Sequence, residues 1–220
     1  MPTSSGQRLL RFDRKLGARF VAGVDEAGRG SLAGPLVVAG VLLDYECLRD
    51  HRVRPLALLN DSKQLSPDER HELFRAVVGC ASKIAVRIFS AREIDRSGLH
   101  RSNLAGMRSA LGALAPPAEV CLVDGFRLGP TAPPHRAIVD GDTKSAAIAA
   151  ASIVAKVVRD RAMWRMDAVF PHYGFSSHVG YITPGHSAVV RERGPSYIHR
   201  RSFQALCYAD LAETGVGAAG

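Results

Sequence analysis

Residues 21–43 have the sequence VAGVDEAGRGSLAGPLVVAGVLL, in which an acidic pair and a Gly-rich segment separate two apolar runs. Apolar runs that are rich in valine and leucine and bounded by glycine and proline are typical of buried strands. We therefore expect strands over 19–24 and 36–43. Asp25 and Glu26 follow the first of them, and they can share one face of the sheet only if the chain turns there.

The chain beyond this segment alternates predicted strands and helices. Three further strands are expected, over 83–89, 119–123 and 136–139. A capping box at Ser66 and Glu69, with Pro67 between them, predicts the start of a helix. Other helices are expected over 90–115 with a break near 97–98, over 146–169, where alanine recurs, and over 186–193 and 202–213.

This order of elements predicts one α/β domain over residues 19–213, with a helical part at its C-terminal end. Residues 1–18 are expected to form a short, basic, disordered leader, although their composition also resembles a transit peptide. Residues 214–220 are expected to be a frayed tail.

Composition excludes several classes of protein. The 220 residues are 46% hydrophobic and 23% charged, which excludes a wholly disordered chain. The longest apolar run, 32–43, contains two glycines and a proline, so no membrane span is predicted. The four cysteines form no C-x-x-C pair, and we interpret them as small core residues of a cytoplasmic protein.

The chain is strongly basic. Its formal net charge is +8, and only five of its 29 basic residues are lysines, so 24 are arginines. A basic excess of this size favours an anionic partner, nucleic acid first. A codon bias that favours arginine over lysine explains the same composition, so charge alone does not identify the chemistry.

Acidic residues follow three of the five predicted strands. They are Asp25 with Glu26, Asp124, and the pair Asp140 and Asp142. The carboxyl ends of strands are where α/β sheets bind ligands. Two simpler interpretations stay open, because Asp124 before Gly125 is also typical of a turn, and Asp142 of a helix N-cap.

Carboxylates that converge in one place repel each other, and hard divalent cations with oxygen ligands relieve that repulsion. Two such ions about 4 Å apart can activate a water and stabilise the leaving oxygen of a phosphodiester. A basic chain with grouped carboxylates therefore indicates metal-dependent phosphodiester chemistry.

Several blocks of the sequence resemble the type 2 ribonuclease H family, the ribonuclease HII group. Residues 21–35 resemble its opening signature, and NDSKQLS at 60–66 resembles its D-S-K-K-L-S loop. The other blocks are CLVDGF at 121–126, GDTKSAAIAAASIVAKVVRDR at 141–161, HVGYIT at 178–183 and HRRSF at 199–203. The resemblance spans roughly residues 20–205 in the family's order.

The resemblance implies a ribonuclease H-like fold, with a mixed five-stranded sheet flanked by helices and a helical C-terminal extension. It also implies that four acids bind two Mg²⁺ or Mn²⁺ ions: Asp25, Glu26, Asp124 and Asp142. Asp140 stands where relatives often carry lysine, so we do not count it as a ligand. Ser31 and Gln64 are further departures from the family pattern, and neither touches the four acids.

The resemblance further implies which residues contact the substrate. The turn of Gly28, Arg29 and Gly30 would bring backbone groups to the ribose 2′-OH, which distinguishes RNA from DNA. Tyr181 would pack on the deoxyribose that follows the ribonucleotide, and Lys63 and Lys144 would contact phosphates. His178, His186 and His199 fit no zinc spacing, and we expect them to have structural or backbone-binding roles.

The activity implied is hydrolysis of the phosphodiester 5′ to ribonucleotides, in RNA/DNA hybrids and at single ribonucleotides in duplex DNA, giving 3′-hydroxyl and 5′-phosphate ends. We expect a monomer with no membrane association, no obligate protein partner and no clamp contact through the C-terminal tail. Two alternatives stay open: a non-catalytic basic nucleic-acid-binding module, and a nuclease or transposase of the same fold with another substrate. The related ribonuclease HIII has an extra N-terminal domain, which is not expected here because 24 residues precede Asp25.

Overall fold

The computed structural model describes residues 4–48, 56–59, 66–205 and 207–209. The chain groups into two compact units. We call Met1–Ala27, Val37–Ile88 and Asn103–Val157 the sheet unit, and Gly28–Leu36, Phe89–Ser102 and Val158–Gly220 the C-terminal unit. The single-domain organisation over residues 19–213 stays a prediction.

The sheet has five strands in the order β3-β2-β1-β4-β5. β1 is antiparallel to β2 and parallel to β4, which is parallel to β5. The predicted mixed five-stranded sheet is therefore confirmed. The strands are β1 (Phe20–Ala27), β2 (Leu36–Asp44), β3 (Lys83–Phe89), β4 (Val120–Asp124) and β5 (Arg136–Ile138).

One expectation about the first strand is wrong. β1 does not turn after Val24 but continues through both acids to Ala27, with Asp25 opposite Ala39 and Glu26 opposite Val38. The reason is that β2 supplies a complete ladder of partners along this length. The Gly-rich turn begins only after the acids.

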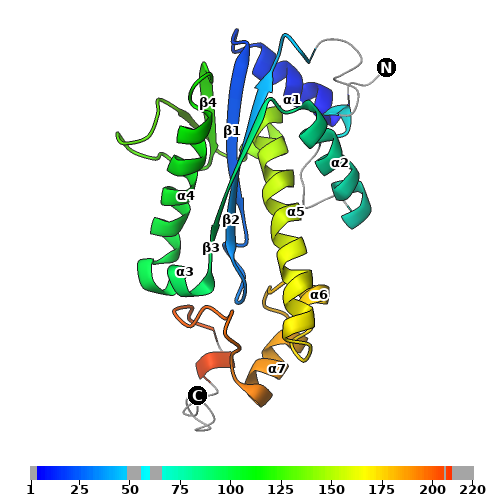
Figure 1. The fold of residues 1–220 in the computed structure, drawn as a ribbon, viewed down its shortest axis with the longest axis vertical. Helices are drawn as coiled ribbons and strands as arrows, with labels where there is room; N and C mark the ends of the chain where they lie inside the picture. Colours follow the sequence, from blue (N-terminus) through cyan, green and yellow to red (C-terminus); the bar gives the residue numbers. More distant parts are fainter. Residues whose placement is uncertain (1–3, 49–55, 60–65, 206, 210–220) are drawn as a thin grey trace. The chain divides into compact units, whose positions relative to one another are not determined.

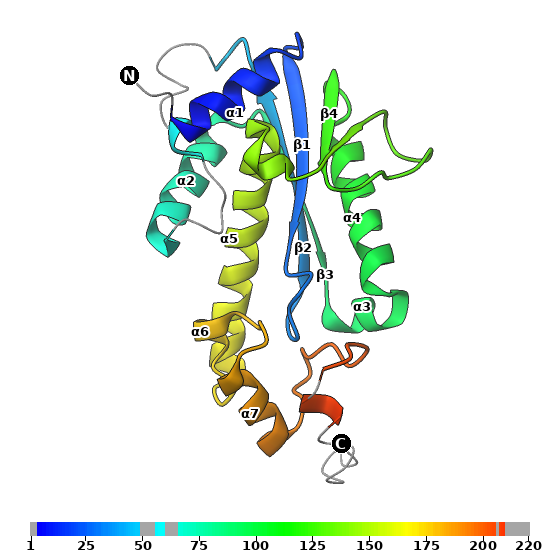
Figure 2. The same ribbon diagram turned by 180° about the vertical axis from the view of Figure 1, so that it is seen from behind.

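Helices cover both faces of the sheet. The helices are α1 (Ser5–Arg14), α2 (Pro67–Cys80), α3 (Ala91–Ser97), α4 (Leu99–Leu114), α5 (Ala146–Val169), α6 (Phe175–His178) and α7 (Pro184–Arg193). Figures 1 and 2 show α4 and α5 on opposite faces of the strands. Glycines in the strands permit this close packing. A Cβ on Gly40 would lie 2.8 Å from Leu114 Cδ1, and a Cβ on Gly23 would collide with the backbone of Ala147 at the start of α5.

Local sequence explains the helix boundaries. Ser66 and Glu69 form the predicted capping box of α2, and Ser90 with Glu93 forms another for α3. Gly98, at φ 83°, separates α3 from α4, where the break was expected. The predicted helix over 146–169 has the bounds of α5, and 207–209 are helical within the expected 202–213.

The expectation of a disordered leader over 1–18 is wrong for most of that segment. Ser4 and Gln7 form a capping box, and α1 runs from Ser5 to Arg14. Leu9, Leu10 and Asp13 of this helix are buried, while its basic side chains are exposed. The basic composition that suggested disorder is the solvated face of an amphipathic helix.

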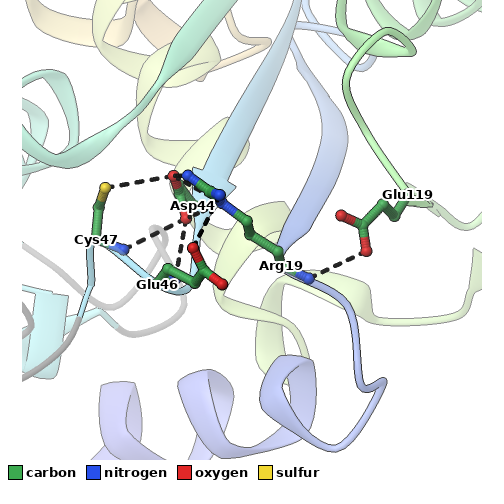
Figure 3. A network of polar contacts seen from close by, with 5 residues as sticks. All are labelled: Arg19, Asp44, Glu46, Cys47 and Glu119. Carbon is green, nitrogen blue, oxygen red and sulfur yellow. Dashed lines mark hydrogen bonds and ion pairs between the residues drawn. The ribbon is translucent and has the colours of Figure 1, made fainter.

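A polar network joins the beginnings of β1 and β4 to the end of β2 (Figure 3). Arg19 binds Asp44 through Nη2 at 2.9 Å and Glu46 through Nη1 at 2.8 Å, and its backbone N–H donates to Glu119. The guanidinium holds the pKa of Asp44 down at about 2. This network lies at the opposite end of β1 from Asp25 and Glu26, so its role is structural.

Among the described residues, every helix is either too short or too polar to cross a bilayer. Cys47, Cys80, Cys121 and Cys207 are all described, and no two of them form a disulfide.

Candidate active site

Asp25, near the end of β1, lies beside Asp124, the last residue of the parallel strand β4. The register of β1 with β4 pairs Val24 with Val123, so the residues that follow stand at the same level of the sheet. Asp25 is 5% exposed, and its carboxylate interacts electrostatically with those of Glu26 and Asp124. The structure thus places Asp25 beside Asp124, while Glu26 is the next residue of the regular strand β1, whose side chains alternate between the two faces of the sheet.

The surroundings of Asp25 disfavour its negative charge. Burial, followed by the charges of Glu26 and Asp124, raises the pKa of Asp25 well above its usual value. Hydrogen bonds from the Ser152 hydroxyl and, at 2.7 Å, from the Glu26 backbone N–H act in the opposite direction. A cation at this place would relieve both the desolvation and the repulsion.

Asp142 is joined to Asp124 through the backbone. The Gly141 N–H donates to Asp124 Oδ1 at 2.7 Å, and Asp142 follows in the short 3-10 turn Gly141–Thr143. A Cβ on Gly141 would lie 2.5 Å from Ile148 Cδ1 and 3.1 Å from Asp124 Oδ1, so a larger residue there would require both side chains to shift. Asp142 is 7% exposed, and the turn that carries it leads directly into α5.

The donor set is suited to a hard divalent cation, because it consists of carboxylate oxygens with a hydroxyl nearby. Across residues 4–48, 56–59, 66–205 and 207–209, however, no three His, Cys, Asp or Glu side chains stand close enough to hold a metal ion. Metal binding here would therefore require the carboxylates to converge further.

Gly28, Arg29 and Gly30 begin the C-terminal unit, directly after the acids in the chain. Gly28 has φ 92°, and a Cβ there would collide with the Arg159 side chain. Among the described residues, a Cβ on Gly30 would meet nothing within 4 Å. The fold therefore requires glycine at position 28, whereas the described residues leave room for a side chain at position 30.

Two buried arginines hold this loop by its carbonyl groups. Arg159 donates from Nε to Pro35 O at 3.0 Å and from Nη2 to Ala33 O at 3.1 Å. Arg200 donates from Nε to Gly34 O at 3.0 Å and from Nη1 to Arg29 O at 3.1 Å. Both side chains are fully buried, and burial lowers the pKa of Arg200 to about 9.

Tyr181 lies beside Arg159 and next to the loop that the two arginines hold. The Arg159 guanidinium lies 5.4 Å from the centre of the Tyr181 ring. The carbonyl of Gly180 accepts hydrogen bonds from the N–H groups of Leu32 and Ala33, at 2.9 and 3.1 Å. The C-terminal unit thus gathers the loop of residues 28–30 and Tyr181.

The two predicted lysines give different outcomes. Lys63 lies outside the described residues, as does Gln64. Lys144 is described, and its Nζ donates to Val139 O at 2.6 Å, which places the ammonium on the turn that carries Asp142.

Sequence reasoning missed Ser152, Arg159 and Arg200. Ser152 had a signal, because it is the one polar residue in the run AAIAAASIVA at 146–155. The two arginines lie in blocks that resemble the family, at 141–161 and 199–203, but their role had no signal because their partners are backbone carbonyls that no residue type reveals.

The family model for ribonuclease HII matches residues 22–206, which include all four acids. The chain belongs to the ribonuclease HII family. A ribonuclease HII from Salinispora tropica is 48% identical over 195 residues, which cover 89% of this chain and 70% of that relative.

Solved structures of related proteins agree with this assignment. The ribonuclease H2 of Pyrococcus horikoshii matches with a TM-score of 0.73 and 27% identity, over 89% of this chain and 98% of that one. A structure of the PCNA:RNase HII complex from Archaeoglobus fulgidus matches with a TM-score of 0.70 and 28% identity, over 84% of this chain and 96% of that one. The predicted ribonuclease H-like fold is confirmed, and the roles of the individual site residues stay predictions.

Proposed function

We propose that this chain is an endonuclease that hydrolyses the phosphodiester 5′ to ribonucleotides, in RNA/DNA hybrids and at single ribonucleotides within duplex DNA. Membership of the ribonuclease HII family supports the ribonuclease H activity. The observation that carries the proposal is the position of Asp25 beside Asp124 near the carboxyl ends of adjacent parallel strands.

We assign metal binding to Asp25, Glu26, Asp124 and Asp142. Two divalent cations held there, Mg²⁺ or Mn²⁺, would activate the attacking water and neutralise the leaving 3′-oxygen. We assign Asp25 and Asp142 to the ion on the water side, and Asp25, Glu26 and Asp124 to the other. Ser152 orients the carboxylate of Asp25 by its hydrogen bond. The products would carry 3′-hydroxyl and 5′-phosphate ends.

We assign recognition of the ribonucleotide to Gly28, Arg29, Gly30 and Tyr181. The open space at Gly30 supports this, because nothing in the described part of the chain requires glycine there, whereas a close approach of the ribose does. Arg159 and Arg200 make the loop rigid by fixing its carbonyl groups, so its backbone can sense a 2′-OH without rearranging.

Lys144 and Lys63 are proposed to contact phosphates. Lys144 would exchange the Val139 carbonyl for a phosphate oxygen. Because a single ammonium is a point charge, each lysine would add to affinity and not to specificity.

We further propose that the protein acts in the cytoplasm as a monomer without an obligate protein partner. The absence of a disulfide among its four cysteines supports a reducing compartment. The Archaeoglobus fulgidus relative was solved together with PCNA. A gel-filtration run of this chain alone and with a sliding clamp tests the monomer and the partner together.

Cleavage of a duplex that carries one embedded ribonucleotide tests the function. With Mg²⁺ or Mn²⁺ we expect cleavage, and with a chelator we expect none. Binding without cleavage under every metal condition would favour the alternative of a non-catalytic module. Equal cleavage of an all-DNA duplex would favour the alternative of a nuclease with another substrate.

A further inference from the structure

Three imidazoles gather in the C-terminal unit. His186 and His199 are 0% and 2% exposed, and their Nε2 atoms are 3.0 Å apart. The ring of His178 stacks on that of His186 with centroids 4.1 Å apart, and Phe175 stands edge-on to both. Burial lowers the pKa of His186 to about 4 and of His199 to about 3, so both rings are neutral near pH 7.

The two rings form a short chain of hydrogen bonds that begins at the Ser196 N–H and ends at the Tyr181 carbonyl. These two backbone groups determine which nitrogen of each ring carries the proton. The Ser196 N–H can only donate, and it points at His199 Nδ1 from 2.9 Å. A neutral His199 with an accepting Nδ1 carries its proton on Nε2. It therefore donates to His186 Nε2.

His186 must then carry its proton on the other nitrogen. Its Nδ1 lies 2.8 Å from the carbonyl oxygen of Tyr181, which can only accept. All three hydrogen bonds therefore run in one direction. The Ser196 N–H donates to His199, His199 donates to His186, and His186 donates to the Tyr181 carbonyl. The Ser196 hydroxyl also lies 2.8 Å from His199 Nδ1 and can donate to that same accepting nitrogen. No other arrangement of two neutral rings pairs both the Ser196 N–H and the Tyr181 carbonyl.

His178 also forms hydrogen bonds to the backbone around Tyr181. The Gly180 N–H donates to its Nδ1 at 3.2 Å, so its Nε2 carries the proton and donates to Tyr173 O at 2.8 Å. The Tyr181 N–H donates to His178 O at 2.9 Å. Both backbone polar groups of Tyr181 are therefore held by histidines.

The segment needs such support because its backbone is strained. Val179 has φ 42° and Gly180 has φ 83°, so two successive residues are left-handed, and the first of them is β-branched. A β-branched residue in this region is a genuine outlier and is held only by its surroundings. The strain lies immediately before Tyr181.

We propose that His199 and His186 form a proton-ordered hydrogen-bond chain that positions Tyr181 for recognition of the junction after a ribonucleotide. They are positioning residues and touch no substrate. The inference rests on the proposed function for the role of Tyr181. The order of the protons does not depend on the role of Tyr181.

Measuring the histidine tautomers by long-range ¹H–¹⁵N NMR near pH 7 tests the chain without any substrate. We expect His199 and His178 to carry the proton on Nε2 and His186 to carry it on Nδ1. Asp167 faces His178 and Arg201 faces His199, so the spectra are compared at two salt concentrations to exclude a charge effect. An Nε2-protonated or doubly protonated His186 would overturn the proposal.

Two substitutions of one residue test the positioning. In His186→Asn the amide nitrogen takes the place of Nδ1 and keeps a donor for the Tyr181 carbonyl, while in His186→Gln it takes the place of Nε2 and that donor is lost. We expect His186→Gln to raise KM for a single-ribonucleotide duplex roughly tenfold more than His186→Asn does, with a smaller change in kcat. Thermal unfolding of both variants checks the fold.

A double variant separates positioning from general damage. If His186→Gln has already displaced Tyr181, then adding Tyr181→Ala should change KM by less than about twofold. Adding Tyr181→Ala to His186→Asn should change KM by as much as it does in the wild-type protein. Equal effects in both backgrounds would refute the inference. If the wild-type protein cleaves nothing, the proposed function fails. The tautomer measurement still decides whether the proton-ordered hydrogen-bond chain exists.

Discussion

The Oδ1 atom of Asp124 accepts a 2.7 Å hydrogen bond from the backbone N–H of Gly141, the residue before Asp142. One carboxylate therefore has two tasks, since it belongs to the acidic group and also fixes the turn that delivers the fourth acid. Charge and turn geometry can be separated by substitution, because an amide oxygen accepts the same hydrogen bond.

Asp124→Asn should keep the turn and remove the charge. We expect cleavage to fall at least about a hundredfold, with stability and duplex binding near those of the wild type. Asp124→Ala should lose the same activity and also about 1–2 kcal/mol of stability, because the Gly141 N–H loses its acceptor. Single-turnover kinetics and urea unfolding measure the two effects, and near-wild-type turnover in Asp124→Asn would remove this residue from the site.

Alanine at the two glycines of the loop should have different effects. Gly28→Ala should destabilise the protein by roughly 1–3 kcal/mol, because φ is positive there and the new Cβ meets Arg159. Gly30→Ala should leave the melting temperature almost unchanged, because the Cβ has free space. It should nevertheless reduce cleavage at a single ribonucleotide about tenfold or more if the ribose approaches there. Full activity in a stable Gly30→Ala protein would argue against this contact.

Asp13 should make stability depend on pH between about 4 and 6. Its carboxylate is fully buried in α1, where it accepts from Tyr45 Oη at 2.7 Å and from the Ala147 N–H at 2.9 Å. Burial raises its pKa to about 6. The folded protein therefore binds this proton more tightly than the unfolded chain, so the contribution of Asp13 to stability is greatest below pH 4 and is lost as pH rises through 6.

The comparison of wild type with Asp13→Asn measures this dependence. The wild type should lose up to about 3 kcal/mol relative to the variant between pH 4 and 7. Urea unfolding at several pH values provides the data. An opposite slope would mean that the hydrogen bonds to Asp13 outweigh its burial.

Asp44 should give the opposite dependence at lower pH. Arg19 holds its pKa at about 2, below the ordinary value, so the folded chain releases this proton more readily. The contribution of Asp44 is present above pH 4 and is lost as pH falls toward 2. Asp44→Asn should cost about 1–2 kcal/mol at pH 7 and less at pH 3, with cleavage activity unchanged. A constant difference between pH 7 and 3 would contradict the pairing with Arg19.

Patterns local in sequence predicted most of the fold. The five strands as elements, the capping box of α2 and the full extent of α5 depend on neighbours within a few residues, and these were confirmed, whereas the end of β1 was predicted too early. The leader was predicted wrongly because the order of α1 depends on distant partners. Asp13 reaches Tyr45 and Ala147, which lie 32 and 134 residues away along the chain.

The candidate site was predicted in part for the same reason. Acids at strand ends are visible in the sequence, and parallel pairing brings Asp25 beside Asp124. Arg159 and Arg200 looked like two more basic residues of a basic surface. In the fold they are buried among carbonyl groups, and this can be recognised only once the loop of residues 28–35 has its shape.

The position of the cut on a duplex with one ribonucleotide tests the central claim most directly. The reaction products, run beside a ladder of known lengths, identify the broken bond and the chemistry of its ends. We predict a single cut 5′ to the ribonucleotide that leaves a 3′-hydroxyl and a 5′-phosphate, and that disappears in Asp124→Asn and Asp142→Asn. A cut 3′ to the ribonucleotide, or unchanged cleavage by both variants, would contradict the account.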